Sequence, residues 1–112
     1  MAKPGRPFGS KIRQNLIEIL FYLGEGYGYE LHKLHEQLFK PCTKEVIYYH
    51  LKRGVERNEF EVKEVKIESG NFSWGPQTRK IIYKLGTLAR PHMTEDIKEP
   101  IEQFLKERNT KT

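Results

Sequence analysis

The hydrophobic period of the chain changes once, near residue 60, and this change limits the folds that the sequence can adopt. Before it, apolar residues recur every three or four positions in three short stretches, which is the spacing of amphipathic helices. After it, "FEVKEVKIE" (residues 60–68) and "TRKIIYKL" (78–85) are rich in branched apolar residues that alternate with charges, as in strands. The sequence therefore predicts three helices followed by a β-hairpin.

Residues that cap or break helices bound the three predicted segments. Side-chain oxygens favour the N-cap position, glycine follows helix ends, and the residue before a proline disfavours helical dihedrals. These rules predict helices that begin after Ser10, near residue 29 and after Thr43, and that end at Gly24, before Pro41 and near residue 57. Residues 24–28 are predicted to form a turn, and Glu25 and Glu30 to be surface acids.

The apolar faces of these helices are expected to bury one small core, which the hairpin covers. Its central members are predicted to be Leu20, Leu34, Ile47 and Leu51. Asn58 suits the left-handed position after a helix, and the alternation slips near residues 63–64, where we expect a twist or bulge. This order of elements predicts an α+β fold that is mainly α, a winged helix-turn-helix with a β-hairpin wing.

A last helix is predicted near the C-terminus, opened by Thr94 or Glu99, with Pro100 at its start or at a kink. Its single apolar stripe packs either on the first helix or on its copy in a dimer. The expected organisation is a flexible basic arm (1–9), a winged-helix domain (10–92), a C-terminal helix (93–108) and a disordered tail (109–112).

Charge and composition exclude several classes of function. The formal net charge is +5, and residues 1–13 and 69–93 each carry four bases and no acid, which favours a polyanionic partner. No apolar run is long enough to span a membrane, and one cysteine excludes an internal disulfide. The four histidines lack a metal-ligand spacing, and no catalytic motif is present. We predict a cytoplasmic protein with no cofactor, metal or enzymatic activity.

Three motifs in the same order resemble the PadR-type winged-helix regulators. They are "GYGYELHKL" (26–34), "TKEVIYYHLKRGVERNEF" (43–60) and "RKIIYKLG" (79–86). The chain departs from that pattern at Gly54-Val55, where leucine is usual, and at Asn58, where glycine is usual, so that a related archaeal-type winged helix is an equal alternative. The resemblance implies a transcription regulator that binds double-stranded DNA as a homodimer joined by C-terminal helices, and so associates with the nucleoid.

The predicted DNA contacts lie on the third helix and the wing. Residues at the start of a recognition helix reach base edges, and later ones meet phosphates. We therefore expect base contacts from Lys44, Glu45, Tyr48 and Tyr49, phosphate contacts from Lys52 and Arg53, and wing contacts from Asn71, Trp74, Arg79 and Lys80. Tyr48 could instead be a half-buried structural residue, and Trp74 could fold back on the hairpin. An alternative function is a protein–protein module anchored by Phe72 and Trp74.

The N-terminal stretch "KPGRPFGSK" (3–11) resembles an AT-hook, whose core is Arg-Gly-Arg-Pro. Gly5 would let the backbone approach the groove floor, Pro7 would hold it extended, and Arg6 would lie in a narrow A/T-rich minor groove. Pro4 stands where the hook has its first arginine, so that one groove arginine remains. Phosphate contacts are expected from Lys3, Lys11 and Arg13. The alternative is a nonspecific basic leader.

Replacing Arg6 by alanine separates these two alternatives. If the arginine reads a narrow minor groove, Arg6→Ala weakens binding more for duplexes with A/T-rich flanks than for G/C-rich flanks. Fluorescence anisotropy with both duplexes measures the difference, and Lys3→Ala serves as the matched change of charge. Equal losses on both duplexes would leave only a nonspecific basic leader.

Overall fold

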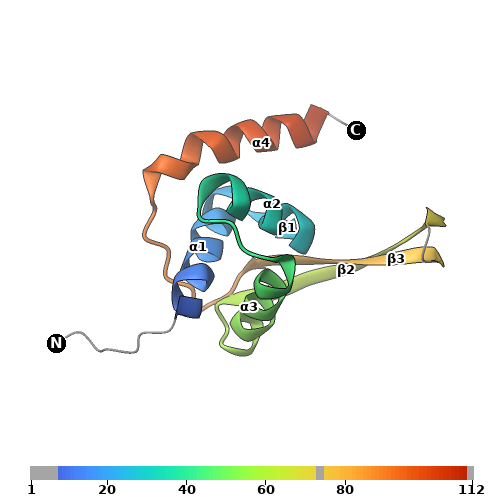
Figure 1. Ribbon diagram of the computed structural model, residues 1–112, viewed down its shortest axis with the longest axis horizontal. Helices are drawn as coiled ribbons and strands as arrows, with labels where there is room; N and C mark the ends of the chain where they lie inside the picture. Colours follow the sequence, from blue (N-terminus) through green and yellow to red (C-terminus); the bar gives the residue numbers. More distant parts are fainter. Residues whose placement is uncertain (1–7, 73–74, 111–112) are drawn as a thin grey trace.

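The structure, a computed structural model, describes the backbone of residues 8–72 and 75–110 and the side chains of residues 11–67 and 80–109. It has the predicted winged helix-turn-helix fold with an added C-terminal helix (Figure 1). The elements in chain order are α1 (Phe8–Leu23), β1 (Glu25–Tyr27), α2 (Gly28–Leu38), α3 (Lys44–Glu56), β2 (Phe60–Phe72), β3 (Gly75–Leu85), the 3-10 turn η1 (Glu95–Ile97) and α4 (Lys98–Thr110).

The sheet contains one strand that the sequence did not reveal. The strand order is β1-β3-β2, antiparallel throughout, and the long β2–β3 hairpin projects from the helices as the wing (Figure 1). The prediction of a plain turn at residues 24–28 was wrong, because Glu25–Tyr27 pairs with Lys84–Ile82 of β3. Three residues are too few to show an alternating pattern, so that only the neighbouring strand makes this segment a strand.

The predicted bulge in β2 is confirmed, and it sets which side chains share a face of the wing. The register shifts between Val62, which lies opposite Tyr83, and Glu64, which lies opposite Ile82. Lys63 is therefore the extra residue. Directly opposed residues of antiparallel strands face the same side of the sheet. The bulge thus turns Val62 to the same face as Val65, which lies opposite Ile81.

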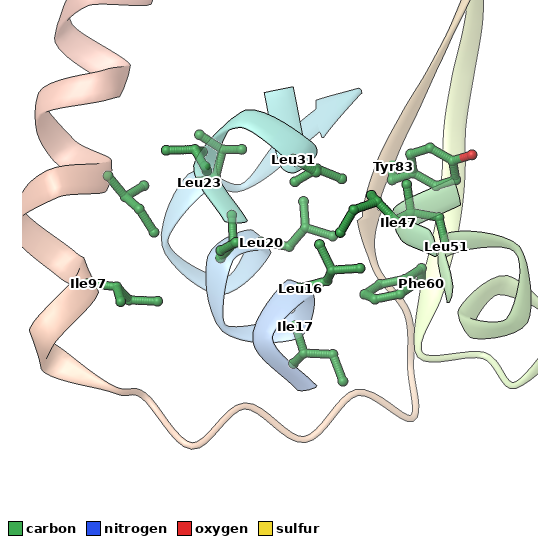
Figure 2. Close-up of a cluster of buried hydrophobic side chains, with 13 residues drawn as sticks. Leu16, Ile17, Leu20, Leu23, Leu31, Ile47, Leu51, Phe60, Tyr83 and Ile97 are labelled. Carbon is green, nitrogen blue, oxygen red and sulfur yellow. The ribbon is translucent and has the colours of Figure 1, made fainter. Parts of the chain in front are cut away.

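The core is centred on α1, which lies between α4 on one side and α3 with the wing on the other (Figure 2). The predicted central residues Leu20, Leu34, Ile47 and Leu51 are all buried. Phe60 of β2 joins them and packs against α3, where a Cβ on Gly54 would lie 2.0 Å from its ring. Gly54 therefore leaves room for an aromatic ring at the start of the wing.

Both predicted ends of α3 agree with the structure. The Thr43 hydroxyl caps α3 by accepting from the backbone N–H of Val46 at 3.3 Å, and Asn58 takes a left-handed φ of 62°. The predicted cap at Ser10 was wrong, because α1 already begins at Phe8. The preference of serine for the N-cap position was the only ground for that boundary, and residues 8–10 contain nothing that prevents the helix from starting earlier. Helix α4 extends to Thr110, two residues past the predicted end.

Helix α4 packs back on α1 of its own chain, which is one of the two arrangements left open by the sequence. Ile97 and Ile101 are buried in the shared core. Near the other end of the helix, the Arg108 guanidinium lies 3.1 Å from the Glu30 carboxylate, which also accepts from the backbone N–H of Tyr27. Glu30 was expected on the surface but is buried, because it serves both α4 and the start of α2.

A second buried carboxylate, Glu18, fixes the segment that leads to α4. It is 3% exposed and accepts from the backbone N–H groups of His92 at 2.5 Å and Thr94 at 3.1 Å, and from the Gln14 amide at 2.7 Å. Burial by itself raises the pKa of Glu18, but these three hydrogen bonds outweigh it and hold the pKa below its ordinary value. The ionised form is therefore part of the folded structure.

Replacing Glu18 by glutamine tests this role through pH. The folded pKa lies below the unfolded one, so the stabilisation by the carboxylate is fully present above about pH 4.5 and is lost as the pH falls through the folded value. We expect Glu18→Gln to lower the free energy of unfolding by about 1–3 kcal/mol at pH 7, because the bonds to a charged acceptor are lost. The difference from wild type should shrink toward pH 3.

Urea unfolding at pH 7, 5 and 3.5 measures the difference. Glu102→Gln, an exposed acid on α4, is the control and should change little at any pH. A loss for Glu18→Gln that stays constant over this range would assign the effect to side-chain shape rather than to charge.

Candidate nucleic-acid interface

Helix α3 has one buried and one exposed face. Its buried residues are Ile47, His50, Leu51 and Gly54, at the three- and four-residue spacing of one helix face. The residues predicted to contact DNA are all exposed on the rest of the helix: Lys44, Glu45, Tyr48, Tyr49, Lys52 and Arg53. The helix is thus held by its core face and offers a polar and aromatic surface to solvent.

Tyr48 lies against the start of α2. Its side chain remains 44% exposed, but a Cβ on Gly28 would lie 2.0 Å from its ring. The ring therefore rests directly on the backbone of α2. Tyr48 is half-buried and contacts another element, which is the structural alternative raised by the sequence, while its outer edge stays accessible.

An open pocket of about 530 Å³ lies beside Tyr48, between α2, α3 and the wing. Its lining combines four phenol rings with one ammonium group and, apart from Gly28, one aliphatic side chain. The residues are Tyr27, Gly28, Tyr29, Tyr48, Lys80, Ile81 and Tyr83. None of these lining residues is acidic, so the pocket is suited to an anion or to a ring that stacks on tyrosine.

Lys80 is held in this pocket by Tyr27. Its ammonium nitrogen lies 4.7 Å from the centre of the Tyr27 ring and 3.4 Å from the hydroxyl oxygen. A lysine over an aromatic ring is attracted by the electron density of the ring face. The sequence had grouped Lys80 with the residues of the wing tip, whereas the structure brings it together with Tyr48 of α3.

The other tyrosines of the pocket were not predicted as site residues. Tyr27 and Tyr29 belong to the motif "GYGYELHKL", so their close spacing can be seen in the sequence. The spacing alone does not indicate that both side chains line one pocket. Tyr83 looked like an ordinary strand residue. Burial, together with nearby Tyr48, raises the pKa of Tyr83, so its hydroxyl stays neutral and can donate a hydrogen bond.

Arg13 has an internal partner rather than an open position. Its Nε donates to the Glu59 carboxylate at 2.8 Å, and one terminal nitrogen lies 3.4 Å from Nδ1 of His50. Burial, followed by the charges of Arg13 and Arg53, lowers the pKa of His50, so this ring is neutral at neutral pH. The cluster ties α1 to the junction between α3 and β2.

The remaining residues predicted to contact DNA differ in how much of them the structure describes. Lys11 is exposed on α1. Residues outside the described part are Lys3, Gly5, Arg6, Pro7 and Trp74, and residues placed in strands without described side chains are Asn71, Phe72 and Arg79.

The histidines and the cysteine make contacts within the fold. His35 is buried beside Asn15, with 3.2 Å between the ring and amide nitrogens, and His32 lies 2.9 Å from the carbonyl oxygen of Cys42. Burial lowers the pKa of His35 and raises that of Cys42. Among the residues with described positions, no three acidic, histidine or cysteine side chains are grouped as metal ligands, and no helix has the length and apolar character to cross a membrane.

Similarity to known proteins is found among solved structures. No protein-family model matches the chain, and no curated protein matches it. Among solved structures, the chain is similar to a PadR family transcription regulator from hypervirulent Clostridium difficile R20291, with 22% sequence identity and a TM-score of 0.43. The match covers 86% of this chain and 88% of that chain. The geometry of the site itself carries the functional proposal.

The contact between Gly28 and Tyr48 can be tested by a double mutation. Gly28→Ala places a methyl group where the Tyr48 ring lies, so the ring must swing outward, and we expect a loss of about 1–2 kcal/mol in the free energy of unfolding. In a Tyr48→Ala background the same change should cost nothing. Urea unfolding of the four proteins measures the coupling, and equal losses in both backgrounds would show that the two residues do not interact.

Proposed function

We propose that this protein binds duplex DNA as a transcription regulator or chromatin-associated factor, with α3 as the recognition helix. The observation that carries the proposal is the exposed face of α3 next to an aromatic pocket that contains a lysine and no acid. Such a surface combines donors for phosphate with planar groups that contact sugars and bases. A helix face that is charged only to remain solvated would not require exposed tyrosine rings or a pocket beside it.

The exposed start of α3 is proposed to enter the major groove. A groove about 12 Å wide admits one helix, and the residues of its first turns reach base edges. Lys44, Glu45 and Tyr49 project from this part of α3 and are available for base contacts. Lys52 and Arg53 follow one to two turns later, where the helix would leave the groove and meet phosphate oxygens.

The pocket beside α3 is proposed to seat the DNA backbone. Tyr48, which the sequence assigned to base contacts, rests on α2 and lines the pocket together with Lys80. A phosphate there would accept from tyrosine hydroxyls and from the ammonium group of Lys80, which the Tyr27 ring already positions. This contact would set the position of α3 along the groove without reading sequence.

The wing and the N-terminal arm are proposed to add contacts outside the major groove. The hairpin projects from the helical body, so its tip can follow the backbone or reach an adjacent minor groove (Figure 1). The basic arm of residues 1–9 would lie in an A/T-rich minor groove. A homodimer through the C-terminal helices would supply two-fold symmetry for a palindromic site, and such a protein would associate with the nucleoid.

Binding to a mixed-sequence duplex over a series of salt concentrations tests the proposal. Each phosphate that a lysine or arginine neutralises releases counterions, so the logarithm of the affinity falls linearly with the logarithm of salt. We expect Lys52→Gln and Arg53→Gln each to weaken binding and to reduce that slope by about 1. The effect of Arg53 should be the smaller, because it also pairs with Glu56 at 3.3 Å.

Lys98→Gln is the matched control, because this exposed lysine lies at the start of α4, away from α3. It should leave both affinity and slope close to wild type. Absence of binding at low salt, or binding that does not depend on salt, would overturn the proposed function. An equal loss for Lys98→Gln and Lys52→Gln would show that α3 has no special part in it.

A further inference from the structure

Strand β2 is the outer strand of the wing. In the strand order β1-β3-β2 it pairs with β3 on one side, and no strand of the described residues covers its other side. The outward backbone groups of an outer strand can pair with a strand from another chain. Natural proteins commonly block such pairing with bulges and charges, and β2 has both, so the arrangement of these charges decides what the strand can accept.

Three apolar residues of β2 beyond the buried Phe60 lie on one face and are open to solvent. Val62 is 45% exposed, Val65 48% and Ile67 61%. Val62 and Val65 lie opposite Tyr83 and Ile81 of β3, and Ile67 lies opposite Arg79, so the three share a face of the hairpin. Without the extra residue at Lys63, Val62 would face the other side. The bulge therefore creates a continuous apolar row along an uncovered strand.

The charged residues of the same segment are self-complementary in one antiparallel register. When two copies of β2 are related by a two-fold axis between Lys63 and Glu64, Val62 lies opposite Val65 of a second copy. Glu61 then lies opposite Lys66, and Lys63 opposite Glu64. Every charge meets its opposite and the valines meet each other, an arrangement that stabilises strand pairs.

The bulge is compatible with this register. A two-fold axis perpendicular to the sheet keeps each side chain on the face it already occupies. Val62 and Val65 share a face only because of the bulge, and both copies have the same two residues between them, so the strands stay in step. Glu61 stays on the opposite, charged face of the wing. It lies opposite Lys84 of its own β3, with 3.7 Å between the Glu61 carboxylate and the Lys84 ammonium nitrogen.

Neighbouring registers are disfavoured by like charges. Moving the two-fold axis by half a residue places Lys63 opposite Lys63 of a second copy, or Glu64 opposite Glu64. Moving it by one residue places Glu61 opposite Glu64, or Lys63 opposite Lys66. Like charges directly opposite each other destabilise a strand pair. The charges thus favour this register over its four nearest neighbours.

We propose that β2 is a self-association surface, on which two copies of this chain pair antiparallel through residues 61–66 and join their wings into one continuous sheet. The occupant of the free edge is a second copy, because the charge pattern matches itself. The pairing is separate from the C-terminal helix and independent of DNA. It would hold two recognition helices about a common two-fold axis.

Swapping the charges of Glu61 and Lys66 in the 112-residue chain tests the proposal in the absence of DNA. Analytical ultracentrifugation over a series of protein concentrations should show reversible self-association of the wild type. Glu61→Lys and Lys66→Glu each place like charges at two positions of the symmetric pair, and we expect the dissociation constant to rise by roughly tenfold. The double variant Glu61→Lys/Lys66→Glu restores opposite charges and should return to within about twofold of wild type.

Glu36→Lys, an exposed change of the same charge on α2, is the control and should associate as wild type does. Hydrogen exchange gives a second readout, since amides of residues 61–66 should exchange more slowly at higher concentration in the wild type and the double variant. A wild type that stays monomeric, or single variants that associate as strongly as wild type, would overturn the proposal. So would a double variant that associates no better than the single variants.

Discussion

The packing of Phe60 against Gly54 is the contact on which the arrangement of helix and wing depends. The ring occupies the space that a side chain at Gly54 would fill, so α3 and the first residue of β2 are held together. Around it, the N–H of Glu59 bonds to the carbonyl of Gly54 at 2.8 Å, and the N–H of Gly86 bonds to the carbonyl of Glu59 at 2.8 Å. A side chain on Gly86 would collide with the backbone of Asn58. The angle between α3 and the wing is therefore set at a junction of a few residues, which Arg13 joins to α1 through its bond to Glu59.

From this junction the wing acquires two chemically different faces. One face carries ion pairs across the three strands, including Lys63 with Glu25 of β1 at 2.5 Å. The other starts at Tyr83 in the pocket and continues outward along the exposed side chains of Val62, Val65 and Ile67. A single extra residue in β2 keeps these faces distinct, because it restores the alternation that the sequence interrupts. Because of this extra residue, Lys63, the apolar side chains of β2 lie on the same face of the wing as Tyr83 of the pocket.

Two buried carboxylates attach the C-terminal part to this body. Glu18 accepts from the backbone on either side of Met93, which itself has a left-handed φ of 58°. Glu30 joins the start of α2 to Arg108 near the end of α4. A buried acid is costly unless its oxygens are satisfied, and here backbone N–H groups and a guanidinium satisfy them. These contacts fix α4 along α1 by hydrogen bonds as well as by the burial of Ile97 and Ile101.

The sequence by itself determined the helices, the long hairpin and the core residues, because periodic apolar spacing, a threonine cap and the left-handed Asn58 are local properties. It also placed the bulge, since a slip in alternation is visible along the strand. Only the tertiary structure decided the third strand, the buried roles of Glu18 and Glu30, the internal pairing of Arg13 and the tyrosine pocket. Each of these joins residues far apart in the chain, and a local pattern does not show which distant backbone or charge a side chain will meet. The exposed face of α3 follows from the helical period, whereas the pocket beside it exists because Gly28 lets Tyr48 approach α2 and the wing brings Lys80 alongside.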